Sequence, residues 1–126
     1  MIKGIGTDIL EINKLYPIIQ QEDYINDSFI RKVFTDKEIE LAESRPIPVN
    51  CYATRFSGKE AVFKALGVSS DSLRLNEIEI LSDKNGKPYV NLLGKAARIA
   101  KEKEITQILI SLSYDNKYSM AFCIAQ

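Results

Sequence analysis

The order of apolar and polar residues predicts a strand and then an interrupted helix at the start of the chain. Residues 2 to 9 alternate in character, as expected for a strand with two different faces. From about residue 9 to 21 the apolar residues recur at helical spacing instead. Pro17 falls inside that stretch, and we expect it to end, kink or restart the helix.

The remaining pattern predicts more helices and two hairpins. Helices are expected over about 27–33, 36–44, 50–66 and 94–104. Thr35-x-x-Glu38 fits a capping box for the second of these, and Gly67 suits the C-terminal end of the third. Strands are expected over about 77–81, 88–92, 107–113 and 118–125. Asn85-Gly86 between the first two is a strong hairpin signal. The fold class is therefore α+β, with helices packed on a small, mainly antiparallel sheet in a single domain over residues 1–126.

Charge and cysteine usage narrow the function classes. Lys plus Arg and Asp plus Glu both number 17, so no global basic field favours nucleic acid or an anionic membrane. Cys51 and Cys123 are far apart and form no CxxC pair, which favours two reduced, buried thiols. The first residues lack the features of a signal peptide, and no apolar run approaches the roughly 20 residues of a membrane span. We expect a cytoplasmic protein.

The chain contains no histidine. This absence excludes Ser-His-Asp and Cys-His mechanisms and any metal site that uses histidine. Chemistry here must depend on carboxylates, lysines, arginines, hydroxyls or a hard cation.

Two carboxylates stand at positions that call for an explanation. Glu60 falls among Phe56 and Phe63 on the apolar face of the predicted helix, where a charge needs a partner or a metal. An internal ion pair with Lys64 explains it equally well. Asp8 could cap a helix, but it follows Gly4 and Gly6 on one strand face, where another element or a ligand can approach. If the strand end meets the helix, Asp8 and Glu60 could bind one Mg²⁺.

Several motifs together resemble one family. Gly6-Thr7-Asp8, followed some fifty residues later by Phe56-Ser57-Gly58-Lys59-Glu60-Ala61-Val62-Phe63-Lys64, is similar to the two-part signature of the 4'-phosphopantetheinyl transferases. Other segments resemble the short, bacterial holo-acyl-carrier-protein synthase branch in the expected order, namely Val33 to Glu38, Arg55-Phe56, Lys64 to Gly67, Gly86-Lys87-Pro88 and Ser111-Leu112-Ser113.

The resemblance implies an activity and a set of site residues. The activity is transfer of phosphopantetheine from coenzyme A to a serine of an apo-acyl carrier protein, with release of 3',5'-ADP. Asp8 and Glu60 would hold Mg²⁺ against the pyrophosphate, with Glu60 and Lys64 as the catalytic groups. Further coenzyme A contacts would come from Arg55, Lys59, Lys64, Gly86, Lys87, Pro88, Ser113 and Tyr114. The base that deprotonates the serine is either Glu60 or a metal-bound water, and the sequence does not choose between them.

Three of these assignments have simpler explanations. Lys59 could be a solvated edge residue, Arg55 could belong to a surface salt bridge, and the hairpin alone explains Gly86. Tyr114 departs from the family pattern, because many members carry histidine there. Tyrosine donates one hydrogen bond but does not become cationic near neutral pH. A non-catalytic protein that binds coenzyme A or a carrier protein is therefore the main rival interpretation, followed by a scaffold domain.

The same resemblance implies partners. It implies a homotrimer with active sites at subunit interfaces, and the apolar C-terminal hairpin is the sequence feature that agrees with this. Acyl carrier proteins are acidic, so a basic patch should meet them. Its candidate members are Lys14, Arg31, Lys32, Lys37 and Arg45, although scattered solvated charges would look the same.

Overall fold

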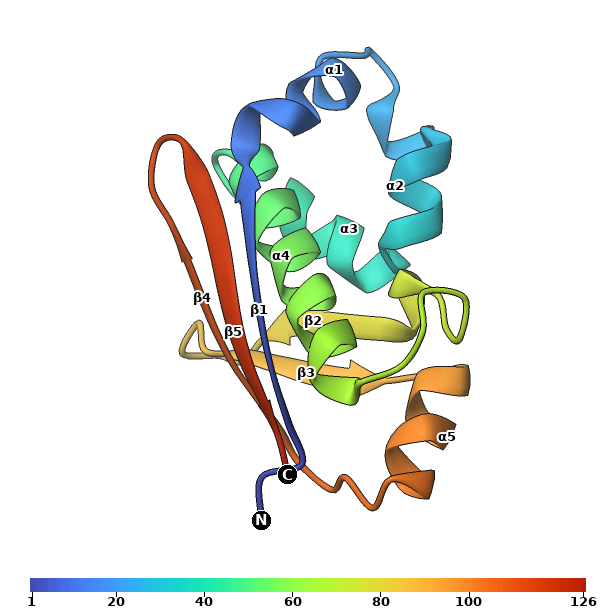
Figure 1. Cartoon of the computed structure of the whole chain (residues 1–126). Coiled ribbons are helices and arrows are strands. Elements are labelled where there is room, and N and C mark those ends of the chain that lie inside the picture. The colour runs from blue at the N-terminus through green and yellow to red at the C-terminus, as the bar shows by residue number, and fades with distance from the viewer.

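A long central helix organises the fold. The structure is a computed structural model that describes all 126 residues. Helix α4 (Pro48–Leu66) packs against a three-stranded antiparallel sheet on one side, as Figure 1 shows. The strands of this sheet are β1 (Gly4–Glu11), β4 (Ile108–Tyr114) and β5 (Tyr118–Ala125), in the order β1-β5-β4.

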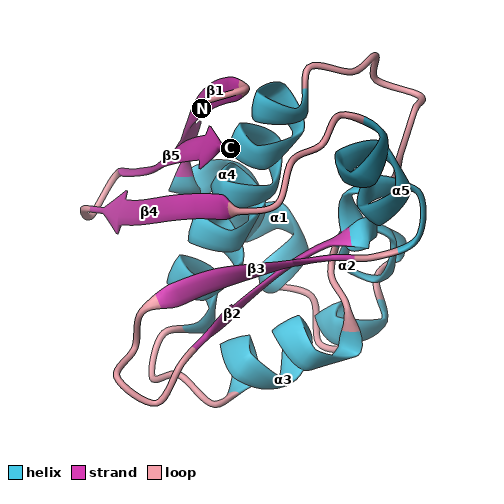
Figure 2. Cartoon of the chain, turned by 90° about the horizontal axis from the view of Figure 1, so that it is seen from below, coloured by secondary structure: helices cyan, strands magenta, loops and turns pink.

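A second, two-stranded sheet crosses below the first, as the view in Figure 2 shows. It consists of β2 (Ile78–Ser82) and β3 (Pro88–Leu92), which form the hairpin that Asn85-Gly86 predicts. Gly86 has φ +83°, a backbone conformation that favours glycine in the turn. The other helices are α1 (Tyr16–Ile19), α2 (Ser28–Val33), α3 (Asp36–Glu43) and α5 (Gly94–Glu102), with short 3-10 turns at Ile12–Leu15, Tyr24–Asn26 and Leu75–Glu77.

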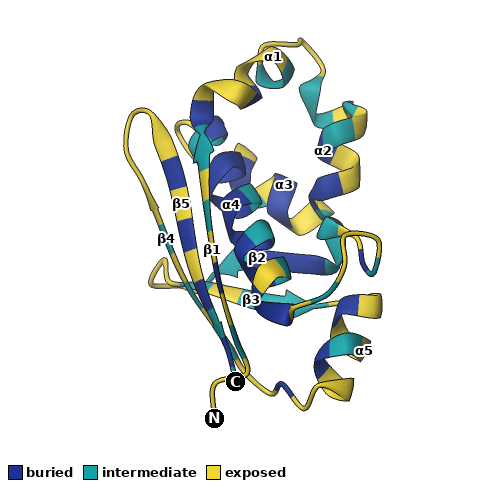
Figure 3. Ribbon diagram, viewed as in Figure 1, coloured by how far each residue is buried: buried dark blue, intermediate teal, exposed yellow.

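Small residues let α4 approach the sheet closely. Ala61 is fully buried, and the Ser57 hydroxyl shares a 2.7 Å hydrogen bond with Ser119 of β5. A side chain on Gly58 would collide with Ile80, which lies in the second sheet. One hydrophobic cluster therefore fills the space between α4, both sheets and α5, and a second lies between α4 and the N-terminal helices. Figure 3 shows α4 as the most continuously buried element.

The α+β class, the capping box and both hairpins are confirmed. Two expectations are wrong. The helix predicted from residue 9 does not begin there, because β1 continues to Glu11 and pairs along its whole length with β5. Asp8 is therefore a strand residue and caps no helix, and the chain becomes α-helical only at Tyr16, with Pro17 in the first turn. The strands also form two sheets rather than one, because β2 and β3 pair only with each other.

Candidate active site

The first strand lies directly on the backbone of α4. A Cβ atom on Gly6 would overlap the carbonyl oxygen of Ala61, and one on Gly4 would overlap that of Ala65. Only glycine permits this approach, so the two glycines serve contact between elements rather than ligand access. The next residue on the same strand face is Asp8, which is thereby brought against the last turns of α4.

Asp8 and Lys64 form an ion pair at this contact. The Lys64 Nζ lies 3.4 Å from Asp8 Oδ1 and donates a 2.9 Å hydrogen bond to the Thr7 carbonyl. Burial raises the pKa of Asp8, and Lys64 opposes that rise. The Lys64 side chain is still 53% exposed, so its ammonium can also reach a ligand from solvent. The internal Glu60–Lys64 ion pair does not form, because Lys64 pairs with Asp8 instead.

Glu60 has neither an ion-pair partner nor a hydrogen-bond donor in the protein, although it is half-buried. Burial raises its pKa, repulsion from Asp8 raises it further, and Lys64 lowers it. Two partly desolvated carboxylates that repel each other are a favourable arrangement for a cation. They fit a hard divalent ion that takes its remaining ligands from water and phosphate. No cluster of three or more acidic, cysteine or histidine residues offers a complete cage.

Lys59 corrects the sequence-based expectation. Its side chain is completely buried, so it neither forms a solvated edge nor reaches a phosphate group in solution. Its ammonium lies 2.6 Å from Glu38 Oε1 and donates hydrogen bonds to the carbonyl oxygens of Leu75 and Ile78. All three donors of the ammonium are therefore satisfied inside the protein.

Arg55 belongs to a small pocket on a different side of α4. It is 8% exposed and donates to the Ser82 hydroxyl and the Ile80 carbonyl. It forms no ion pair, so a surface salt bridge does not explain it. Arg45 also has no acidic partner and lies 3.4 Å from the same hydroxyl oxygen of Ser82. The pocket measures about 160 Å³, and no carboxylate lines it. A pocket with two unpaired arginines favours an anionic ligand.

The hairpin turn and the end of β4 border this arginine pocket. Gly86, Pro88 and Tyr114 all line it, whereas Lys87 is exposed and is not among the lining residues. Ser113 faces the opposite surface of the sheet, where it lines a separate hollow with Ile9 and Tyr114. Tyr114 is 57% exposed and lies between the two.

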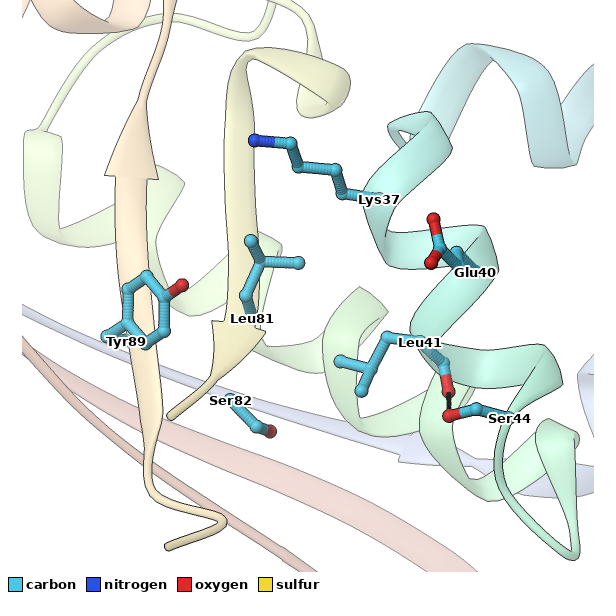
Figure 4. A pocket seen from close by; sticks show the side chains of 7 residues that line it. All are labelled: Lys37, Glu40, Leu41, Ser44, Leu81, Ser82 and Tyr89. Carbon is cyan, nitrogen blue, oxygen red and sulfur yellow. Dashed lines mark hydrogen bonds between the residues drawn. The ribbon is translucent and has the colours of Figure 1, made fainter. Parts of the chain in front are cut away.

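A larger cleft adjoins the arginine pocket through Ser82. Its volume is about 440 Å³, and Figure 4 shows α3 on one side and the second sheet on the other. Lys37 and Glu40 reach it from α3, and Tyr89 reaches it from β3. The opposite charges of Lys37 and Glu40 leave this cleft without a clear preference for anions.

The expected basic patch is divided by the fold. Arg31 and Lys32 line a cavity of about 500 Å³ together with Arg74, and no acidic residue lines it. Lys37 and Arg45 lie in the cleft and the arginine pocket, respectively. Lys14 lies in the 3-10 turn after β1 and lines none of these three hollows.

Comparison with known families shows which family the chain belongs to. The sequence model described as the 4'-phosphopantetheinyl transferase superfamily matches residues 4–123. The chain belongs to this superfamily. It is therefore a phosphopantetheinyl transferase.

Individual relatives agree over almost the whole length. A holo-[acyl-carrier-protein] synthase of Halothermothrix orenii is 36% identical over 126 residues, which cover 100% of this chain and 98% of the relative. The crystal structure of a holo-ACP synthase from Plasmodium yoelii has a TM-score of 0.83 and 37% identity, covering 99% of this chain and 94% of that one. A holo-(acyl-carrier-protein) synthase from Bacillus anthracis in complex with CoA (3',5'-ADP) has a TM-score of 0.78 and 26% identity, with 99% and 96% covered.

The sequence does not predict where two residues near these pockets lie. Arg45 was assigned to the carrier-protein patch, because nothing in its spacing shows that it folds back towards Ser82. Glu38 was recognised only as a capping residue. Its second role, as the partner of Lys59, joins two segments that are 21 residues apart and has no local signal.

Proposed function

We propose that this phosphopantetheinyl transferase moves 4'-phosphopantetheine from coenzyme A to a serine of an apo-acyl carrier protein. The reaction depends on Mg²⁺ and releases 3',5'-ADP. The observation that carries the proposal is the juxtaposition of Asp8, Glu60 and Lys64 on a chain of this superfamily. Transfer of this kind needs positioning and charge neutralisation more than covalent help, so the lack of histidine is no obstacle.

The metal would be held by Asp8 and Glu60. Mg²⁺ commonly takes one or two carboxylates and completes its coordination with waters and substrate phosphates. Glu60, which has no partner in the protein, is the group that gains most from a cation. When bound, Mg²⁺ supplies charge neutralisation at the pyrophosphate. Lys64 is the catalytic cation of the chain itself, because its half-exposed ammonium can contact the transferring phosphate.

The arginine pocket suits the other phosphate of coenzyme A. Its two unpaired guanidinium groups and the Ser82 hydroxyl form a compact set of donors beside the Gly86–Pro88 turn. We assign the 3'-phosphate to this pocket and the adenosine to its border at the turn and Tyr114. Tyr114 can donate a hydrogen bond there, although it cannot supply a charge. The exposed positions of Lys87 and Ser113 leave both as peripheral contacts.

The carboxylates with Lys64 and the arginine pocket lie on different sides of α4, which favours an active site shared between two subunits. Arg55 and Glu60 are five residues apart on α4, which turns their side chains about 140° from each other. The arginine pocket contains none of Asp8, Glu60 and Lys64. A second copy that presents its arginine pocket to the carboxylates would complete the site.

The outer sheet face is a suitable contact for such a copy. Its exposed apolar side chains come from all three strands and are Ile5, Ile9, Leu109, Met120 and Phe122. Contiguous apolar patches of this kind are typical of protein–protein contacts. We propose a homotrimer that buries this face and shares each active site between two subunits.

The basic cavity between α2 and the 3-10 turn at Leu75–Glu77 suits the acidic carrier protein. Lys32 and Arg74 have no acidic partner there, whereas the region around α1 is mostly acidic. Arg74→Glu should raise the KM for the carrier about tenfold or more and leave the KM for coenzyme A unchanged. Lys101→Glu, an exposed charge on α5, is the matched control. Equal carrier KM values for both variants would rule out this docking surface.

The activity itself is tested by intact mass. The wild-type protein is incubated with coenzyme A and an apo-acyl carrier protein, with Mg²⁺ or with EDTA. The carrier should gain one phosphopantetheine, and 3',5'-ADP should appear, only with Mg²⁺. If coenzyme A binds but several apo-carriers remain unmodified, the protein is a binder and not the enzyme proposed.

A further inference from the structure

Lys59 occupies a position where a charge is difficult to keep. Its ammonium is wholly buried and is held by the Glu38 carboxylate and by the carbonyl oxygens of Leu75 and Ile78. Glu38 is itself 2% exposed. Burial lowers the pKa of the lysine and raises that of the glutamate, while their mutual attraction opposes both changes. The pair therefore persists because its surroundings satisfy it completely.

Glu38 makes this ion pair the meeting point of three elements. One of its oxygens accepts from the Thr35 backbone in the capping box of α3, and the other accepts a 2.8 Å bond from the Ile80 N–H of β2. The Thr35 hydroxyl extends the network with a 2.7 Å bond to Glu79. The segments Val33 to Glu38 and Phe56 to Lys64, both noticed in the sequence, are thus joined through Glu38 and Lys59.

Stability alone does not account for such a pair. A buried ion pair adds little compared with apolar residues of the same volume, because both charges lose their hydration. Replacement of such a pair by uncharged residues of similar volume is often neutral or stabilising. A charged pair at this position therefore serves one fixed geometry better than it serves stability.

The residue that needs this geometry is the next one along the helix. Lys59 anchors α4 to α3 and β2, while Ala61 is in contact with Gly6 of β1 on another side. Glu60 lies between these two anchors. A rotation of α4 by about 10° would move a carboxylate some 6 Å from the axis by about 1 Å. Magnesium coordination, with bonds of about 2.0–2.1 Å in near-octahedral geometry, does not tolerate such a shift.

We propose that Lys59 is a positioning residue for Glu60, and that its clamped ammonium fixes the rotation of α4 so that Glu60 and Asp8 can share one divalent cation. The inference rests on the proposed function, since it assumes that Asp8 and Glu60 form a metal site. It assigns the lysine that precedes the glutamate a role inside the protein instead of a contact with coenzyme A.

The experiment measures metal binding directly. Mn²⁺, which accepts the same oxygen ligands as Mg²⁺, is titrated into each protein, and the free ion is followed by electron paramagnetic resonance. Thermal midpoints and near-ultraviolet circular dichroism show that each variant is folded. The variants are Lys59→Met, the double variant Glu38→Gln/Lys59→Met, and Ile105→Ala as a destabilised control from the segment between α5 and β4.

Lys59→Met leaves Glu38 unpaired and should lower the thermal midpoint strongly. The double variant removes both charges and should recover much of that loss. The single and the double variant should nevertheless both bind Mn²⁺ about tenfold more weakly than wild type. In both, residue 59 can no longer donate hydrogen bonds to the Leu75 and Ile78 carbonyl oxygens. Ile105→Ala should lose stability and bind Mn²⁺ normally.

A double variant that binds Mn²⁺ as tightly as wild type would overturn the inference, because Lys59 would then serve stability alone. Weakened binding by Ile105→Ala would also overturn it, since any destabilisation would produce the effect. Failure of the wild-type protein itself to bind Mn²⁺ would instead refute the proposed metal site, and the inference with it.

Discussion

Single residues divide the candidate site into an acidic part and a basic part. Glu60 and Asp8 repel each other beside Lys64, whereas Arg45 and Arg55 lack acidic partners beside Ser82. Glu60 therefore lacks an ion-pair partner in the folded chain, and the two arginines lack a carboxylate. Perturbed, incompletely paired charges of this kind are commonly found at functional sites.

The arginine pocket predicts a specific change in substrate preference. Arg45→Met should raise the KM for coenzyme A about tenfold to a hundredfold, because a charge-assisted hydrogen bond contributes roughly 1.5–3 kcal/mol. The KM for 3'-dephospho-coenzyme A should change little. Steady-state kinetics with both substrates measure the difference, and Arg98→Met on the exposed face of α5 is the control. If the KM values for coenzyme A and 3'-dephospho-coenzyme A rise equally, the 3'-phosphate does not bind in this pocket.

The two carboxylates predict how stability depends on pH. The folded-state pKa values of Asp8 and Glu60 are both raised, so the folded protein holds their protons more tightly than the unfolded chain. Their contribution is fully present below the ordinary carboxylate pKa and is lost as pH rises through the folded-state values. Mg²⁺ should reverse this loss, so the rise in Tm that it causes should grow across the same window and then level off. Differential scanning calorimetry from pH 4 to 8 tests this, and a rise in Tm that is independent of pH would contradict it.

At the level of elements, the position of Asp8 depends on how closely β1 lies on α4. Gly6 has no room for a side chain, because the Ala61 carbonyl occupies the place of its Cβ atom. The backbone contact at Gly6 therefore fixes the position of Asp8, which lies two residues further along β1.

Gly6→Ala should consequently separate the strand from the helix. We expect a loss of about 1–3 kcal/mol in the free energy of unfolding, as for other overpacked sites. Mg²⁺-dependent activity should fall more than stability alone explains. Urea unfolding and activity assays provide the measurement, with Lys3→Ala as a control in the same segment. A stable and fully active Gly6→Ala would show that the close contact is not needed.

The elements also show how much of the fold and site could be predicted from sequence. The capping box at Thr35 and the Asn85-Gly86 hairpin depend on nearby residues, so local pattern was sufficient for both. The end of β1 was misjudged because its pairing with β5 is decided by residues more than 100 positions away. Periodicity placed Glu60 on the apolar face of its helix and Asp8 on one face of its strand, but only the packing of β1 on α4 brings the two carboxylates close enough to repel each other.

Long-range pairing also explains the errors within the site. Lys59 looks like a surface lysine on a helical wheel, since the wheel contains no information about Glu38 or the Ile78 carbonyl. Arg45 lies in the loop between α3 and α4, and nothing in the local sequence shows that its side chain reaches Ser82. Both roles arise only when α3, α4 and the second sheet are packed together.

At the level of the whole molecule, the outer sheet face and the divided site predict shared active sites. Glu60→Gln and Arg45→Glu each disable a different half of the site, so each variant alone should be nearly inactive. In a mixed trimer, some interfaces unite two intact halves. Each trimer that contains both variants has about one third of its interfaces intact.

Co-expression of the two variants with different affinity tags tests this. The doubly purified complex should recover up to about one third of the wild-type rate, because each mixed trimer has one intact interface out of three. A complex no more active than the sum of the separate variants would place both halves of the site in one chain. Sedimentation of the wild-type protein as a monomer would exclude the shared site altogether.

The most direct test of the account is whether Glu60 is needed for phosphopantetheine transfer. Wild type, Glu60→Gln and the exposed control Glu102→Gln are each given coenzyme A, Mg²⁺ and apo-acyl carrier protein, and the intact mass of the carrier is followed with time. We predict transfer by wild type and the control, and a rate at least about a hundredfold lower for Glu60→Gln, because several kcal/mol of metal-dependent stabilisation is lost. Transfer by Glu60→Gln at the wild-type rate would contradict the metal site on which the account depends.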